Sequence, residues 1–515
     1  MSMSVYGSRL SLRHFRDRQR RGRQLRQSLA CLSAGSLCLL PFAHARAMAG
    51  SLNPWTQSQE NLRELSQTSH EHHERQRLTK EKSRNAQEEQ QAQKELLAAR
   101  QHLEMCQTEL KIYEQTQFRN QLIEERRAYW QQETAKAAAA RDRAEISLTD
   151  KQVRALEIER QLQDLDKKNQ VKTGMAYASW SGGTSRPAGA DKGSQLILPV
   201  EASYEKDGFS AQAKGGFLWQ NQENEQGTGK DLTSLLDLET EVSYEPKFSG
   251  PRGLRYILGL RLPTGRTQSI RDLMPDGFGA ADYEHRGWEV TPGIEFSYHY
   301  TEQDVLKTRF DVSFPGDYNA PDLQGWQPEV HPGNRYRPSL TYLHTGGTSS
   351  YMLKAVCVAE EQTEMENFRY RPGVQSLWGA YAEHYISDRD AVQAYASSFR
   401  QLAGHYDMGF PDFAGLETDG RFSGTIYGLG WRHEENPSLS YYVRAGYMKM
   451  GGTRLEPARY LWQQDVKRWS GTIGMERQLR EDLHLGAELS YYSQKDEIQG
   501  DIHGWQSLVM LNRLF

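Results

Sequence analysis

The segment LHLGAELSYY at residues 483–492 and the segment WQSLVMLNRLF at residues 505–515 decide the fold class of this chain. In the first segment, apolar residues occupy every second position. A period of two places alternate residues on opposite faces of a β-strand. In the second segment Trp505, Val509, Leu511 and Phe515 share one face. The two segments therefore predict a terminal β-hairpin with one apolar face and one polar face.

The end of the chain resembles the terminal strand of Gram-negative outer-membrane β-barrels, whose last residue is usually Phe with apolar residues at alternate positions before it. Val509, Leu511 and Phe515 carry the resemblance. It implies that they form the carboxy-terminal assembly signal for a barrel assembly machinery, and that lipid of the outer membrane surrounds the barrel. Arg513 departs from the usual apolar choice at its position. The resemblance is to a class, porin-like and transporter-like barrels, and to no specific family.

The composition is compatible with a membrane barrel. The chain has 515 residues, 37% of them hydrophobic, and a mean hydropathy of -0.78. It has no apolar run of about 18 residues beyond its amino-terminal region, which excludes spanning helices. A barrel exposes alternate residues to lipid and to its lumen, so its average hydropathy resembles that of a soluble protein. The formal net charge of -4 and the absence of a basic stripe argue against a nucleic-acid partner.

Residues 1–47 have the pattern of an export signal. Eight arginines between residues 9 and 26 precede an apolar core at residues 29–42, and small-x-small cleavage options end at Ala45 and Ala47. Removal of this segment takes two of the four cysteines and leaves Cys106 and Cys357 far apart. A disulfide framework is therefore not expected.

Residues 57–170 predict a helical coiled coil in the periplasm. Gln, Glu, Arg, Lys and Ala dominate, and Leu96, Leu103 and Leu110 lie seven residues apart. A break at Ser147–Asp150 would divide the segment, and the sequence leaves open one helix of roughly 160 Å or a folded-back hairpin of about half that length. His70 and His73 could share a helix face, but we expect a solvated face there, without a metal or other cofactor.

Residues 171–515 predict a transmembrane antiparallel β-barrel of about 16 strands, because a period of two persists over the whole region. Short turns at 206–208, 301–304, 345–348, 387–390, 435–438 and 479–482 alternate with longer connections at 264–286, 315–334, 403–420 and 451–465. An even number of strands places both barrel ends, and with them the coil, on the short-turn side, which is the periplasm.

The residues between the apolar positions are often charged, and a dry core would not tolerate them unpaired. A hydrated lumen would accommodate them, either as salt bridges that brace the wall or as a selectivity element. The glycine-rich segment 265–287 is a candidate constriction of that lumen. The candidate lumen-lining residues are Asp237, Glu239, Glu241, Arg255, Arg261, Glu295, His299, Lys307, Arg309, Asp311, Arg335, Arg337, Arg444 and Glu488.

These observations predict an outer-membrane channel for a polar solute or polymer, with the coil as a spacer, a self-association element or a docking rod toward peptidoglycan or an inner-membrane partner. Two alternatives stay open. One is a non-conducting barrel that anchors a helical rod to peptidoglycan or an envelope assembly. The other is an autotransporter-like barrel with the coil as a surface passenger. An enzyme is not expected, because no Gly-x-Ser-x-Gly, His-Glu-x-x-His or phosphate-binding glycine loop occurs.

Overall fold

The computed structural model divides the chain into two compact units. One contains Gln67 and the residues before it together with Asn169–Phe515, and the other contains Thr68–Lys168. The export signal expected at 1–47 and most of the candidate constriction at 265–287 lie outside the described residues. The structure describes residues 54–116, 120–165, 169–182, 192–223, 229–247, 250–265, 287–319, 329–365, 368–371, 373–407, 417–418, 421–436, 438–454, 462–480, 482–496 and 500–515.

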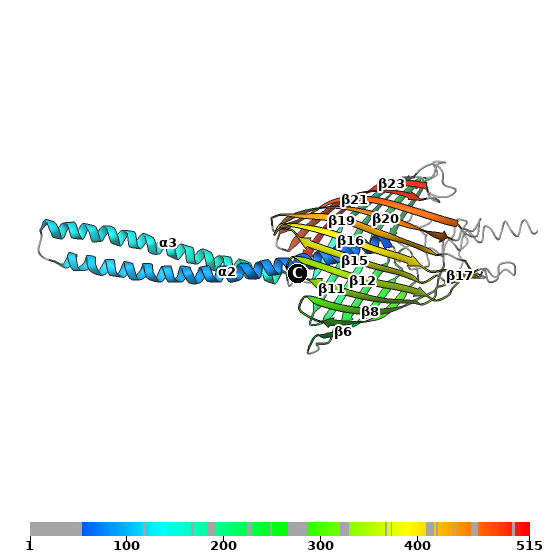
Figure 1. Cartoon of the computed structure of the whole chain (residues 1–515), viewed down its shortest axis with the longest axis horizontal. Coiled ribbons are helices and arrows are strands. Elements are labelled where there is room, and N and C mark those ends of the chain that lie inside the picture. The colour runs from blue at the N-terminus through cyan, green and yellow to red at the C-terminus, as the bar shows by residue number, and fades with distance from the viewer. Residues whose placement is uncertain are drawn as a thin grey trace, which may run out of the picture. The chain divides into compact units, whose positions relative to one another are not determined.

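The helical unit is a hairpin of two antiparallel helices. Helix α2 spans Pro54–Gln115, of which the part after Gln67 belongs to this unit, and helix α3 spans Gln121–Leu165 (Figure 1). Ion pairs join low-numbered to high-numbered positions, as antiparallel packing requires: Lys82 Nζ lies 2.8 Å from Glu159 Oε1, and Arg100 lies 3.9 Å from Glu145. Of the two arrangements left open by the sequence, the folded-back hairpin is therefore the one that forms.

The break between the helices differs from the prediction. Residues Ser147–Asp150 are helical, and the Thr149 hydroxyl donates to the backbone oxygen of Glu145 at 2.9 Å instead of capping a new helix. The chain instead reverses between Gln115 and Gln121. Asn120 Oδ1 accepts the backbone N–H of Ile123 at 2.9 Å, which caps the start of α3.

The second unit contains a closed antiparallel barrel of sixteen strands, as predicted. Its sheet has seventeen segments, but β4 and β5 both pair with β3 and are two halves of one interrupted strand. The segments are β1 (Gln170–Gly182), β2 (Lys192–Lys206), β3 (Phe209–Glu223), β4 (Gly229–Leu235), β5 (Leu238–Tyr244), β6 (Arg252–Leu262), β7 (Glu289–His299), β8 (Asp304–Pro315), β11 (Arg335–Thr345), β12 (Ser349–Glu360), β15 (Gln375–Tyr385), β16 (Asp390–Gln401), β19 (Phe422–Asn436), β20 (Leu439–Arg454), β21 (Trp462–Arg480), β22 (Leu483–Asp496) and β23 (Gly500–Leu514).

The first and last strands close the barrel. β1 and β23 pair along their length, from Gln170 opposite Leu514 to Gly182 opposite Ile502. The Phe515 N–H donates to the Asn169 carbonyl at 2.9 Å, so both ends of the barrel lie at the same rim. All six predicted short turns connect strands at this rim, and a seventh, between Tyr244 and Arg252, was not predicted.

The longer connections lie at the opposite rim and carry a second, six-stranded sheet (Figure 1). The strands follow the order β18, β17, β14, β13, β10, β9. Their bounds are β9 (Tyr318–Asn319), β10 (Glu329–His331), β13 (Thr363–Met365), β14 (Phe368–Arg371), β17 (Gly404–Asp407) and β18 (Glu417–Thr418).

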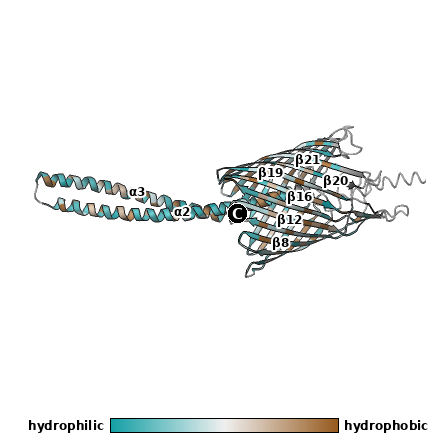
Figure 2. Cartoon of the chain, viewed as in Figure 1, coloured by the Kyte–Doolittle hydropathy of each residue, from teal (hydrophilic) through white to brown (hydrophobic). Residues whose placement is uncertain are grey.

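The barrel wall exposes its apolar side chains on the outside. Val200, Leu353 and Leu429 are 49%, 51% and 68% exposed, and hydrophilic and hydrophobic residues alternate along the strands (Figure 2). The residues of the expected assembly signal, Val509, Leu511 and Phe515, are also exposed. Among the described helices, none has the length and apolar character needed to cross a membrane.

Candidate functional site in the barrel lumen

The first fourteen residues of α2, Pro54–Gln67, lie inside the barrel; we call them the lumenal helix. The sequence predicts a coil from residue 57, but these residues pack with the barrel unit instead. Trp55, Leu62 and Leu65 recur on one helical face and are at most 8% exposed. That face belongs to one buried cluster with inward-pointing side chains of β12, β15, β16, β19, β20 and β21, namely Met352, Val356, Leu377, Tyr381, Tyr395, Phe399, Phe422, Ile426, Met448, Met450 and Val466.

This packing explains why the alternation of residues is weak near 374–386 and 391–402. On β15 and β16 the inward residues Tyr381, Tyr395 and Phe399 are aromatic and buried, because they pack in one cluster with the lumenal helix. Outward neighbours such as Trp378, which is 59% exposed, are apolar as well. A strand that is apolar on both faces does not show the alternation of apolar and polar residues that is seen when one face contacts lipid and the other contacts water.

A glycine on β20 makes room for the lumenal helix. A Cβ atom added to Gly446 would lie 2.6 Å from Cη2 of Trp55 and 2.7 Å from the Tyr395 hydroxyl. The Trp55 ring also lies beneath the Arg468 guanidinium, with 4.9 Å from Arg468 Cζ to the ring centre, in a cation–π arrangement. The position of Trp55 thus depends on a missing side chain on one strand and on a cation on the next.

Polar contacts fix the rotation and depth of the lumenal helix. The buried hydroxyls of Ser58 and Ser397 lie 2.6 Å apart. Asn61 Nδ2 donates to the Tyr381 hydroxyl at 2.9 Å. Two ion pairs lie on the exposed faces of the helix: Arg63 with Glu488 at 3.0 Å, and Glu64 with Lys354 at 2.9 Å.

A buried charge cluster holds the lumenal helix where it nears the short-turn rim. Ser66 Oγ accepts from Gln393 Nε2 at 2.8 Å and from Arg432 at 3.4 Å. The Arg432 guanidinium in turn lies 3.1 Å from Glu383 and 3.4 Å from Glu434, and all three charged residues are buried. Buried charges are tolerated when they are paired and hydrogen-bonded, so this cluster depends on Arg432 staying in place.

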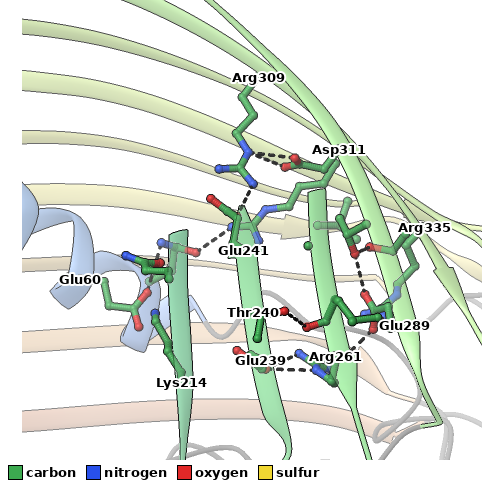
Figure 3. A pocket seen from close by; sticks show the side chains of 18 residues that line it. Glu60, Lys214, Glu239, Thr240, Glu241, Arg261, Glu289, Arg309, Asp311 and Arg335 are labelled. Carbon is green, nitrogen blue, oxygen red and sulfur yellow. Dashed lines mark hydrogen bonds and ion pairs between the residues drawn. The ribbon is translucent and has the colours of Figure 1, made fainter. Parts of the chain in front are cut away.

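The other side of the lumenal helix borders a polar cavity of about 420 Å³ (Figure 3). Strands β3, β5, β6, β7, β8 and β11 supply most of the wall of this cavity. We call these strands the cavity-lining half of the barrel, and we call β12, β15, β16 and β19–β21 its helix-contacting half. Gln57 and Glu60 of the lumenal helix complete the cavity. Its charged residues are Lys214, Arg261, Arg309, Arg335 and Arg337, and Glu60, Glu239, Glu241, Glu289 and Asp311.

Most charges in the cavity are paired across neighbouring strands. Arg309 lies 2.9 Å from Asp311 and 3.0 Å from Glu241. Arg261 pairs with Glu239 at 2.7 Å, and Arg335 pairs with Glu289 at 2.5 Å. The five cations and five carboxylates leave the lining formally neutral. The cavity can therefore hold polar molecules in water without a strong preference for one sign of charge.

Seven of the fourteen candidate lumen residues line this cavity: Glu239, Glu241, Arg261, Arg309, Asp311, Arg335 and Arg337. Arg255 and Glu295 lie elsewhere, 3.8 Å apart, and Arg255 also pairs with Glu245. Asp237 accepts the Gly265 N–H at 3.1 Å. Arg444 and Glu488 lie on the side of the lumenal helix, where Arg444 donates to Gln393 at 3.1 Å. His299 ends β7 at the short-turn rim, and Lys307 is half-buried on β8.

The sequence prediction misses every functional residue of the lumenal helix, above all Gln57 and Glu60. A signal was present in the sequence. Trp55, Ser58, Leu62 and Leu65 are spaced three, four and three residues apart, which is a buried helical stripe that has no heptad partner in the coil.

No family model matches the chain, and no curated protein matches it. Solved structures with which it aligns include a bacterial polysaccharide outer membrane secretin (11% identity, 67% of this chain and 98% of that chain, TM-score 0.35) and OccK3 of Pseudomonas aeruginosa (9% identity, 68% and 96%, TM-score 0.34). A mutant of the TodX monoaromatic hydrocarbon channel aligns with 13% identity over 67% of this chain and 90% of that chain, at a TM-score of 0.32.

The class of the protein follows from its own geometry. A closed, even-stranded antiparallel barrel with an apolar outside, charged residues on part of its inner face, short turns at one rim and long connections at the other is the architecture of outer-membrane β-barrels.

Proposed function

We propose that the protein is an outer-membrane channel for small polar solutes, which pass along the cavity-lining half of the lumen beside the lumenal helix. The observation that carries this proposal is the charged cavity of about 420 Å³ inside a closed barrel. A sixteen-stranded barrel is wide enough to leave an aqueous passage. A helix about 10 Å across fills only part of such a lumen.

The lumenal helix acts in this proposal as a partial plug that narrows the channel. Its apolar contacts hold it against one half of the wall, and this leaves the charged half facing water. Small solutes fit this arrangement better than a polymer, because the helix and the wall enclose the cavity on opposite sides.

The helical hairpin stands in the periplasm in this proposal, since both barrel ends lie at the short-turn rim. There it serves as a spacer, a self-association element or a docking rod toward peptidoglycan or an inner-membrane partner. Outer-membrane lipid and the barrel assembly machinery are the remaining proposed partners.

One observation favours the non-conducting anchor as a second candidate. The lumenal helix buries Leu62 and Leu65 to 1% and 0% exposure and carries ion pairs on its other faces. A helix fixed this firmly would also transmit force between the barrel and a rod attached to the cell wall. In that case the cavity would be a closed space and not a passage.

Single-channel conductance in a planar bilayer separates the two. We would compare the refolded full chain with a variant that lacks Pro54–Gln67. The channel proposal predicts small, stable steps from the full chain and larger steps from the deletion variant. A full chain that is folded but silent, with a conducting deletion variant, would favour the anchor; silence of both would exclude a channel.

A further inference from the structure

The cavity contains charged groups that form no ion pair with the described residues of the wall. Among the described residues, Arg337 forms no ion pair, and its one hydrogen bond goes to Gln57 Oε1 at 3.3 Å. Lys214, on β3, forms neither an ion pair nor a side-chain hydrogen bond with any described residue, although it lines the same cavity. Two cationic groups are thus available to a ligand.

The lumenal helix supplies an available group of opposite charge. Glu60 faces the cavity and is exposed to it, and its one hydrogen bond within the described part of the chain is a 3.5 Å contact from Gln57, one turn earlier. Asp311 and Glu241 of the wall, like Glu60, lie close enough to Arg337 to act on it electrostatically, although none of the three forms an ion pair with it. Figure 3 shows Glu60 on the helix and Lys214 on the neighbouring wall strand.

Groups of both signs in one neutral cavity favour a ligand that carries both charges. A ligand with only negative charge would be repelled by Glu60 and would leave it unpaired. A ligand with only positive charge would be repelled by Arg337 and Lys214. A ligand with a carboxylate and an ammonium group satisfies all three: its carboxylate accepts from the Arg337 guanidinium and Lys214, and its ammonium donates to Glu60. A volume of about 420 Å³ lies within the range of small-molecule sites.

We infer that this cavity is a binding site for a small zwitterion of the amino-acid class, held between the barrel wall at Arg337 and Lys214 and the lumenal helix at Glu60. This inference deepens the proposed function, since it names the class of solute and rests on the cavity being accessible. It also gives the lumenal helix a part in recognition, because one of the three ligand-binding groups belongs to it.

Calorimetric titration of the refolded full chain tests the site without relying on conductance. The probes are L-glutamine, glutarate, which has carboxylates only, and 1,4-diaminobutane, which has amines only. We expect L-glutamine to bind more tightly than either probe of one charge. Glu60→Gln and Arg337→Gln should each weaken L-glutamine binding on the order of ten-fold, as expected for the loss of one charge-assisted hydrogen bond.

A matched control is Arg400→Gln, which changes an exposed, outward-facing arginine of β16 and should leave binding unchanged. Absence of L-glutamine binding by the folded chain would overturn the inference. Binding that Arg337→Gln weakens and Glu60→Gln does not would also overturn it, because it would indicate a carboxylate site. Conductance without L-glutamine binding would support the channel proposal and reject the zwitterion-binding site.

Discussion

The two halves of the barrel wall share the same strand geometry but differ in the residues on their inner faces. The helix-contacting half has apolar residues on both faces, with Tyr381 and Phe399 inside and lipid-facing residues such as Trp378 outside. The cavity-lining half keeps one apolar face and carries paired charges such as Arg309 and Glu241 inside. The content of the lumen, helix or water, therefore determines the inner residues, whereas the outer residues have the same apolar character in both halves.

The largest effect is expected from loosening the helix-contacting half. Leu62→Ala with Leu65→Ala removes two side chains that are 1% and 0% exposed. Each change should cost about 2–5 kcal/mol of helix packing, because the tight site leaves a cavity. The measurement is single-channel conductance, which should rise several-fold or fluctuate as the helix leaves its place.

The matched control changes two leucines of the helical hairpin, Leu96→Ala and Leu103→Ala, which are each 7% exposed. They should lower the stability of the hairpin and leave conductance as it is. An equal change of conductance in both double variants would contradict a specific role of the lumenal helix.

The second prediction concerns the buried charge cluster at the base of the helix. Arg432→Met removes the guanidinium that lies 3.1 Å from Glu383 and 3.4 Å from Glu434, both of which are buried. Removing one partner of a buried ion pair costs about 3–5 kcal/mol. The temperature at which the folded barrel changes its gel mobility should fall clearly. Arg400→Met, at an exposed site on β16, should stay within about 0.5 kcal/mol of the native protein.

The third prediction concerns the ion selectivity of the cavity-lining half. Arg309→Gln frees Glu241 and Asp311 and makes the neutral lining negative by one charge. A unit charge a few ångströms from a passing ion contributes about 1 kcal/mol in water, so the preference for cations should rise roughly five-fold. The reversal potential in a KCl gradient measures this.

Arg513→Gln, which breaks an ion pair with Asp482 near the carboxy-terminal residue, serves as the control for Arg309. It should leave the reversal potential unchanged. A shift with Arg513→Gln, or none with Arg309→Gln, would mean that ions do not pass the cavity.

The smallest effect is expected in the helical hairpin, because its ion pairs are exposed to water, which weakens them. Hydrogen bonds from Lys151 and Arg84 lower the pKa of Glu88, and a hydrogen bond from Lys82 lowers the pKa of Glu159. A lowered folded-state pKa means that the stabilisation is present above the unfolded pKa of 4.5 and is lost as the pH falls through the folded value.

The helical circular dichroism signal should therefore melt at a slightly lower temperature as the medium is acidified below pH about 4.5. Glu88→Gln with Glu159→Gln should remove this pH dependence and keep the melting temperature at its acidic value. A double variant with the full acid sensitivity of the native chain would assign the effect to other carboxylates.

The sequence predicts the barrel well because lipid imposes one rule on every strand. Outward positions such as Leu258 on β6 and Leu353 on β12 follow that rule in both halves of the wall. The inward residues do not follow a single rule. Glu241 lines the cavity and pairs with Arg309, whereas Tyr395 bonds to a helix residue 336 positions earlier in the chain. A period of two reports the face of a residue but not what occupies the lumen.

The helical segment was harder to predict for a local reason. Ser, Thr and Asp are frequent helix caps, so Ser147–Asp150 looks like a boundary. In the helix, Thr149 bonds its own backbone one turn earlier, which the sequence does not distinguish from capping. No residue in the sequence signals that α2 passes from one unit to the other at Gln67, because the helix continues there without Gly or Pro.

The most direct test of the central claim is a disulfide between the lumenal helix and the helix-contacting half of the wall. Ser58→Cys with Ser397→Cys places two thiols where the native hydroxyls lie 2.6 Å apart, close to the geometry that a disulfide needs. The control pair, Ser58→Cys with Thr291→Cys, joins the helix to the cavity-lining half, where no such contact exists between these two described residues. Oxidation of the folded protein should cross-link the first pair nearly completely, seen as a shift of mobility on a non-reducing denaturing gel, and the second pair little. Failure of the first pair to cross-link in a folded barrel would show that the helix lies outside the lumen.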